Sequence, residues 1–413
     1  MKSAGLFASI LLAPVVAGAV LMWNMEHNPD VATPVAGTSW LVIAAFGIAF
    51  ALTPATGHLA RRLGAIDRPG GRKIHDRPTP LLGGAAIYAA FAICVAPCAL
   101  GSRELRGIFL SSSLIFIVGA VEDTRGLSAR MRLAFQTIAV MVLIRSGVEL
   151  TFLPPTWWGI TGEWVLTFLC IVGITNAFNF LDGLDGLAGG SAAINGFFLG
   201  TYAYATGQGS LAFLSLVLSA AALGFLPYNY QPHRPQGTAD IFLGDSGSTF
   251  LGFTLASLAV MGDWAEASPK DIIVPVLILA VPIFDMILTT VMRIREGLVN
   301  NFTEWIVYTG RDHFHHRLLS LGIRKKEAVA IIILVNVCLG ISAFLLKGSN
   351  TIDAFLVLGQ VTVVFCIIGY AMVVMKKRRG DIPLQKGRRW DDPQAVSKTE
   401  TATVRRTETG GIP

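Results

Sequence analysis

Charged side chains are scarce in this sequence. Only 15% of its 413 residues are Asp, Glu, Lys or Arg, whereas about a quarter of a typical soluble domain is charged. Apolar residues make up 53% of the chain, and its mean hydropathy is +0.59. This composition excludes an ordinary soluble globular protein and predicts an integral membrane protein.

Cysteine is also rare, and its placement argues against a fold stabilised by disulfides or by zinc. The five cysteines are odd in number and lie inside apolar runs rather than in polar loops. A disulfide framework or a zinc site is therefore not expected, and buried small side chains are the better interpretation. The net charge of +6 does not indicate a nucleic-acid partner, because the basic residues fall in short blocks between apolar runs.

Long apolar runs recur along the chain, and about twenty mostly apolar residues suffice for a helix to cross a bilayer. The sequence predicts an all-α polytopic membrane protein with about 11–12 transmembrane helices. The first run could instead be a signal peptide, because it holds the small-residue stretch "AGA", but its continuation through Trp23 favours a retained helix. The runs are centred at residues 6–23, 40–59, 83–100, 107–121, 133–148, 163–180, 187–205, 210–227, 247–262, 271–292, 327–346 and 353–375.

Lys and Arg gather in alternate loops, which orients the predicted bundle. The loops 61–78, 122–132 and 293–326 are rich in basic residues, and the tail begins with four more from Lys376 on. The loops between them are poor in basic residues, with a mild exception at 101–106. Because Lys- and Arg-rich loops stay in the cytoplasm, we expect these loops and both chain ends on the cytoplasmic side.

Three regions follow from this pattern. Residues 1–39 are expected to form an extra N-terminal helix and an external loop, and residues 40–375 a transmembrane core. Residues 376–413 are polar and rich in Thr, Arg, Gly and Pro. This composition predicts a disordered basic cytoplasmic tail.

Five polar, motif-like segments all fall on the predicted cytoplasmic side. Polar residues at the ends of spans are ordinary, but five such clusters on one face are not. They favour a single cytoplasmic-face active site assembled from several helices. The segments are "RKIHDRPTPLLGG" (72–84), "GAVED" (119–123), "NAFNFLDGLDGLAGG" (176–190), "FLGDSGSTFLG" (242–252) and "GRDHFHHRL" (310–318).

Carboxylates at the ends of spans predict a divalent cation. At comparable membrane depth they would repel one another unless a cation lay among them. Magnesium fits best, because it prefers hard oxygen ligands and accepts few protein contacts. The neighbouring glycines let backbone approach a phosphate, although "GDSGS" lacks the core of an ATPase phosphate loop. The acids are Glu122, Asp123, Asp182, Asp185 and Asp245.

Two basic clusters complete the candidate site. His313, His315 and His316 lie within four residues beside Arg317, and their spacing does not match a zinc-binding helix. Such a cluster can bind a diphosphate and balance charge as a phosphorus–oxygen bond breaks. A second compact cluster contains Arg72, Lys73 and His75.

In this order, the motifs resemble those of the polyprenyl-phosphate N-acetylhexosamine-1-phosphate transferases, which belong to glycosyltransferase family 4. The likeness runs from about residue 61 to 322, and the segments 176–190 and 242–252 are highly specific as a pair. The resemblance implies that undecaprenyl phosphate attacks a UDP-N-acetylhexosamine, giving undecaprenyl-diphospho-sugar and UMP. It also implies a requirement for Mg²⁺ or Mn²⁺ and a place in the bacterial inner membrane, where cell wall and lipopolysaccharide biogenesis begins.

The resemblance also implies roles for individual residues. Asn179 and Asp245 would hold the metal, with Asp182 and Asp185 lining the same site and Asn176 binding substrate. Asp123 of the pair Glu122-Asp123 would deprotonate or orient the lipid phosphate. The donor's phosphates and sugar would contact His313, His315, His316 and Arg317. The lipid phosphate would contact Arg72 and Lys73, and His75 beside them would also bind substrate.

Departures from the family pattern bear on the sugar. Glu122 stands where the family has a first aspartate, so its role is open to a shift. The "HFHHRL" motif is closer to the N-acetylglucosamine-phosphate branch than to the peptidoglycan branch, which transfers phospho-N-acetylmuramoyl-pentapeptide and remains an alternative. Another alternative is a membrane transporter with intramembrane acids, for which Asp285 is the best candidate. Otherwise, Asp285 is a buried, hydrogen-bonded structural acid.

Overall fold

The computed structural model is helical throughout most of the part that it describes. Of the first expected span only residues 15, 16 and 20 are described, and the Arg72, Lys73 and His75 cluster lies outside the described residues, as does most of the predicted tail. The described residues are 15–16, 20, 39–68, 77–99, 101–232, 239–264, 269–301, 304, 310 and 312–378.

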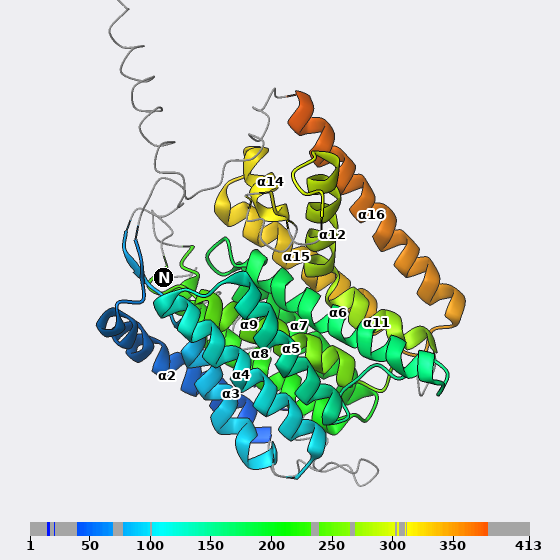
Figure 1. The fold of residues 1–413 in the computed structure, drawn as a ribbon, viewed down its shortest axis with the longest axis horizontal. Coiled ribbons are helices and arrows are strands. Elements are labelled where there is room, and N and C mark those ends of the chain that lie inside the picture. The colour runs from blue at the N-terminus through cyan, green and yellow to red at the C-terminus, as the bar shows by residue number, and fades with distance from the viewer. Residues whose placement is uncertain are drawn as a thin grey trace, which may run out of the picture.

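Each of the eleven apolar runs expected from residue 40 onward is helical, which confirms the all-α class (Figure 1). A short antiparallel pair of strands, β1 (Ile66–Asp67) and β2 (Thr79–Pro80), lies between the first two long helices. The helices are α2 (Ser39–Leu63), α3 (Gly83–Ala99), α4 (Arg103–Arg125), α5 (Ala129–Arg145), α6 (Trp157–Leu181), α7 (Leu187–Ala205), α8 (Gly209–Asn229), α9 (Gly244–Met261), η1 (Pro269–Ile272), α11 (Ile273–Ile278), α12 (Ala280–Arg295), α14 (Phe314–Ser320), α15 (Lys325–Leu345) and α16 (Thr351–Arg378).

Fewer helices pass a strict membrane-span test than the sequence predicts. Among the described residues, six helices are long and apolar enough to cross a membrane, or seven if a bent pair counts as one span. Helices α7 and α9 fall below this test because glycine, serine, threonine and asparagine lower their hydropathy. These small polar residues are buried between helices, where they allow close packing.

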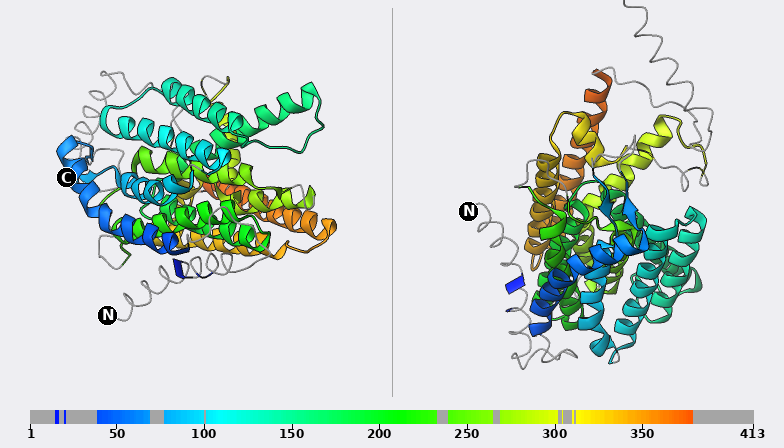
Figure 2. Two further views of the ribbon diagram at one scale, coloured as in Figure 1. Left: turned by 90° about the horizontal axis from the view of Figure 1, so that it is seen from below. Right: turned by 90° about the vertical axis from the view of Figure 1, so that its left-hand side faces the viewer.

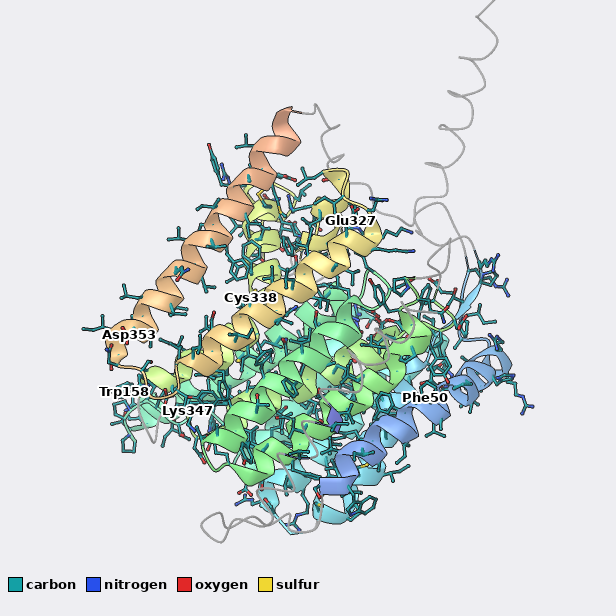
Figure 3. All side chains as sticks on the ribbon, turned by 180° about the vertical axis from the view of Figure 1, so that it is seen from behind. Phe50, Trp158, Glu327, Cys338, Lys347 and Asp353 are labelled. Atoms are coloured by element: carbon teal, nitrogen blue, oxygen red, sulfur yellow. The ribbon has the colours of Figure 1, made fainter. Side chains whose placement is uncertain are left out.

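Helix α8 forms the centre of the bundle. It packs against α2, α3 and α7, and nearly its whole length is buried. Helix α9 packs against α4 and α6 on another side (Figures 1 and 2). Helix α15 crosses the back, with Glu327 near its start and Lys347 just past its end, whereas α16 stands apart at the edge and exposes most of its apolar side chains (Figure 3).

One expected span is bent sharply. The axis turns by 77° between the segment Lys270–Ile278 and α12. Pro282 lies in the first turn of α12 and has no N–H to donate to the preceding turn, which explains the break. The bend directs α12 toward α14 (Figure 1).

Glycines allow the start of α9 to lie against α3 and α4. A Cβ atom on Gly84 would collide with the backbone of Gly247. A Cβ on Gly119 would lie 2.6 Å from Cα of Ser246 and 2.8 Å from the carbonyl oxygen of Asp245. Helices α3 and α4 therefore fix the beginning of α9 by direct backbone contact.

Gly119→Ala should destabilise the protein by about 1–3 kcal/mol, because the added methyl group meets backbone that cannot move aside. The matched control is Gly47→Ala on α2, where a Cβ would meet nothing within 4 Å. Thermal unfolding in detergent measures both. An equal, small effect of the two substitutions would contradict the close packing of α4 on α9.

Candidate active site at the start of helix α9

Asp123 near the end of α4 caps the first turn of α9. Its Oδ1 accepts a hydrogen bond from the backbone N–H of Asp245 at 2.8 Å, and its Oδ2 accepts one from Ser246 at 3.0 Å. Helix α9 has no capping side chain of its own. Gly244 has a φ of +77°, and a Cβ there would lie 2.6 Å from the Asp123 carboxylate. Glycine is therefore required for both the turn and the contact.

Asn179 and Asp245 lie side by side between α6 and α9. The Nδ2 of Asn179 donates to Asp245 Oδ1 at 2.6 Å and to Ser248 Oγ at 3.1 Å. The two residues expected to hold a metal are thus neighbours in space although 66 positions separate them in the chain.

Other carboxylates surround this pair. Burial raises the pKa of Asp182 well above its ordinary value, and repulsion from Asp245, Asp123 and Asp185 raises it further. Asp185 accepts a hydrogen bond from the backbone N–H of Ala239 at 3.2 Å. Glu122 also faces Asp245 and Asp123. All five predicted acids therefore lie within reach of one another's charge, and a hard divalent cation would relieve their repulsion.

The oxygen donors fit magnesium better than a softer metal. Among the described residues, no three His, Cys, Asp or Glu side chains form a ready metal cluster. A cation beside Asp245 and Asn179 would accordingly take its remaining ligands from water or a bound phosphate, as magnesium commonly does.

Glu122 differs from Asp123 in its partner. Its carboxylate forms an ion pair with Arg132 of α5 at 2.9 Å. Glu122 therefore contacts both Arg132 of α5 and Asp245 of α9, whereas Asp123 contacts the backbone of α9.

The histidine segment meets the aspartate loop. His313 is the N-cap residue just before α14, and its ring stacks on Phe180 with centroids 4.6 Å apart. The His315 ring lies directly against Gly183 of the "DGLDG" loop, where a Cβ would collide with it. His315 is almost fully buried, yet neither of its ring nitrogens has a hydrogen-bond partner among the described residues. Its two ring nitrogens can therefore still form hydrogen bonds next to the loop.

Burial controls the charge of α14. It lowers the pKa of His315 to about 3, with His316, whose ring centroid is 4.2 Å away, adding repulsion. Burial also lowers the pKa of Arg317, while Asp312 opposes the shift. The His315 ring is therefore neutral at pH 7, and Arg317 supplies the positive charge of this helix.

Asn176 lies apart from these contacts. Its Nδ2 donates to Gln136 of α5 at 3.2 Å and to the carbonyl of Val172 at 2.7 Å. The structure thus joins Asn179 to Asp245 but turns Asn176 toward a different helix, and the predicted substrate contact of Asn176 stays a prediction.

Asn229, Arg293 and Asp312 were not among the site residues predicted from the sequence. Asn229 accepts a hydrogen bond from Gly186 N–H at 2.8 Å and donates to the carbonyl of Ile241 at 3.0 Å, so it joins the two acidic segments. Arg293 and Asp312 form a buried ion pair. Asp312 lies inside the "GRDHFHHRL" motif, which was its only signal.

The fold and this site define a polytopic all-α membrane protein with an acidic, amide-containing centre flanked by histidines. Comparison with known proteins then identifies its family. The family model described as glycosyl transferase family 4 matches residues 105–263. The chain is 33% identical over 305 residues to a protein of Bacillus subtilis (strain 168) named "Probable undecaprenyl-phosphate N-acetylglucosaminyl 1-phosphate transferase", covering 72% of this chain and 82% of the relative.

Two further relatives agree. A decaprenyl-phosphate N-acetylglucosaminephosphotransferase of Mycobacterium leprae (strain TN) is 31% identical, with 81% of this chain and 89% of the relative covered. An undecaprenyl-phosphate alpha-N-acetylglucosaminyl 1-phosphate transferase of Escherichia coli (strain K12) is 25% identical, with 76% and 85% covered. The chain belongs to glycosyl transferase family 4, which confirms the resemblance read from its motifs.

Asp123→Ala should lower the free energy of unfolding by about 0.5–2 kcal/mol, because the first turn of α9 loses its cap. Asp123→Asn should lose less than Asp123→Ala, since its amide oxygen keeps one of the two backbone contacts while its NH2 group cannot accept the other. Thermal unfolding in detergent compares the two. If Asn proved as damaging as Ala, a role based on charge rather than on capping would be indicated.

The buried His315 ring should make stability depend on pH. The unfolded chain binds the histidine proton near pH 6.5 and the folded protein only near pH 3. Stability is therefore full above pH 6.5 and is lost at about 1.4 kcal/mol per pH unit as the pH falls toward 3.

His315→Gln should flatten this slope between pH 6.5 and 4, measured by thermal unfolding. The control His58→Gln changes an exposed histidine on α2 and should keep the wild-type slope. Identical slopes for wild type and His315→Gln would show that the ring is not buried in its neutral form.

Proposed function

We propose that the protein transfers N-acetylglucosamine-1-phosphate from UDP-N-acetylglucosamine to undecaprenyl phosphate and releases UMP. This reaction would be the first membrane step of a cell-envelope glycan. The names of the relatives support the sugar and the polyprenyl-phosphate acceptor. The observation that carries the proposal is the contact of Asn179 with Asp245 inside a ring of further acids.

The charges of the substrates explain why such a site is needed. Donor diphosphate and lipid phosphate are both anions, so their approach requires positive charge and fixed orientation. Mg²⁺, or Mn²⁺ in its place, would be held by Asp245 and Asn179 and would neutralise the donor diphosphate. Asp182 and Asp185 border the same space and orient what binds there.

The transfer itself exchanges one phosphorus–oxygen bond for another. An oxygen of the lipid phosphate forms a bond to the sugar-bearing phosphorus of the donor. The bond from that phosphorus to the bridging oxygen breaks, and UMP leaves with the electron pair. In this proposal His315, His316 and Arg317 bind the donor, and the neutral His315 ring can donate one hydrogen bond and accept another.

Asp123 has a structural contact in addition to its proposed chemical role. Both of its carboxylate oxygens accept backbone N–H groups of α9. It therefore fixes the position of Asp245, and any orienting of the lipid phosphate would occur from this same geometry.

The location follows from the acceptor. A lipid phosphate is reached only at the membrane surface, and the basic loops support a site on the cytoplasmic side, which in this proposal is that of a bacterial inner membrane. The transporter alternative is not favoured, because the carboxylate of Asp285 is already held by hydrogen bonds. The peptidoglycan alternative is disfavoured by the N-acetylglucosamine names of the relatives.

Purified protein with undecaprenyl phosphate, Mg²⁺ and radiolabelled UDP-N-acetylglucosamine should yield a labelled lipid and UMP. Removing Mg²⁺ with EDTA should stop the reaction, and Mn²⁺ should restore it. Asp245→Ala should reduce turnover by at least about 100-fold while the protein stays folded, since a metal ligand is lost.

A panel of other UDP-sugars serves as the specificity control. Asn336→Ala on α15 serves as the control for a buried polar substitution elsewhere in the bundle. No product with any UDP-N-acetylhexosamine would overturn the proposed reaction. Full activity in Asp245→Ala would overturn the assigned metal ligand.

A further inference from the structure

A buried polar chain of side chains joins α12 to the histidine helix α14. We infer that Asp285 and Arg293 are positioning residues that set the place of α14, and through it the place of His315 and Arg317. This inference rests on the proposed function, because it assigns α14 to donor binding.

Asp285 caps α14 from a neighbouring helix. Its Oδ1 accepts the backbone N–H of Phe314, the first residue of α14, at 2.6 Å, and the Thr289 hydroxyl at 3.4 Å. Its Oδ2 lies 3.1 Å from His313 Nδ1. The side chain is only 1% exposed, and both oxygens are engaged. A carboxylate so held is placed to orient α14 rather than to meet a ligand itself.

Arg293 extends this network of buried polar side chains to Asp312, the residue before His313. Its Nε and Nη2 donate to the two carboxylate oxygens of Asp312 at 2.6 and 2.8 Å. Its Nη2 also lies 3.3 Å from His313 Nε2. The paired geometry fixes both the distance and the plane of the two groups, which a lysine would not do.

His313 lies between Asp285 and Arg293 and contacts both side chains. One ring nitrogen faces Asp285, and the other faces Arg293. Phe180 stacks on the ring face. Since both nitrogens are engaged, His313 serves the network, and the donor contact falls to His315.

The same network reaches Arg317. The backbone carbonyl of Asp312 accepts a hydrogen bond from Arg317 Nε at 2.6 Å. Asp285 and Arg293 lie two turns apart on α12, and together they hold residues 312–314, from which α14 starts. His315 is thereby kept against Gly183, and its ring nitrogens have no hydrogen-bond partner in the described part of the chain.

Asp285→Ala tests this inference with Asp285→Asn as its matched partner. A shift of about 1 Å in a binding group can cost about 100-fold, so we expect kcat/KM for the UDP-sugar to fall by about 10- to 100-fold in Asp285→Ala, with the KM for undecaprenyl phosphate unchanged. Asp285→Asn should recover part of the loss, because an amide oxygen still accepts the Phe314 N–H while the amide NH2 cannot accept from His313.

Arg293→Lys should behave like Asp285→Ala, since one ammonium cannot replace the two-point contact. Asn336→Ala, a buried polar change on α15, should lower thermal stability without changing the donor KM. UMP binding to the purified protein, followed by calorimetry, should weaken in Asp285→Ala and Arg293→Lys independently of turnover.

The outcomes separate this inference from the proposed reaction. A wild-type protein without transferase activity would overturn the reaction, whatever the variants do. An active wild type whose Asp285→Ala form keeps its donor KM and UMP affinity would overturn the positioning role. Equal loss in Asn and Ala variants, or equal loss toward donor and acceptor, would also overturn it, since charge or general unfolding would then be the cause.

Discussion

The hydrogen bonds from the backbone N–H groups of Asp245 and Ser246 to the Asp123 carboxylate determine where the acidic site forms. A carboxylate at the start of a helix is favoured, because the helix dipole and the unpaired N–H groups there attract negative charge. This contact needs a close approach of α4 and α9, which Gly119 and Gly244 permit. It brings Asp245 into a group of like charges that repel one another, and the proposed divalent cation would relieve that repulsion.

A second carboxylate acts in the same way at the start of α14. Asp285 reaches from α12 as Asp123 reaches from α4, so two helix starts are held by acids from other helices. The end of α6 lies between them. Asn179 contacts Asp245 of one half, and the next residue, Phe180, stacks on His313 of the other. The acidic and histidine halves are therefore parts of one structure, although they are far apart in the chain.

The positions of the helices could be predicted from the sequence, because long apolar runs have few alternatives in a bilayer. The bend before α12 could not be placed, since Pro282 signals a break without giving its angle. Asn179 and Asp245 were recognisable by their motifs. The partners of Asp285 and Arg293 were not, because they depend on how α12 and α14 face each other, which no local pattern records. The same holds for Asn176, whose amide turns to α5 instead of α9.

The proposed cation site between α6 and α9 can be tested directly, because a bound manganese ion can be located in a crystal structure. A structure of the protein with UDP-N-acetylglucosamine and Mn²⁺, measured at the manganese absorption edge, would locate the ion by its anomalous signal. We expect one strong peak bonded to the Asp245 carboxylate, the Asn179 amide oxygen and the donor diphosphate. A peak bonded to the histidines of α14, or a bound donor with no peak beside Asp245, would contradict it.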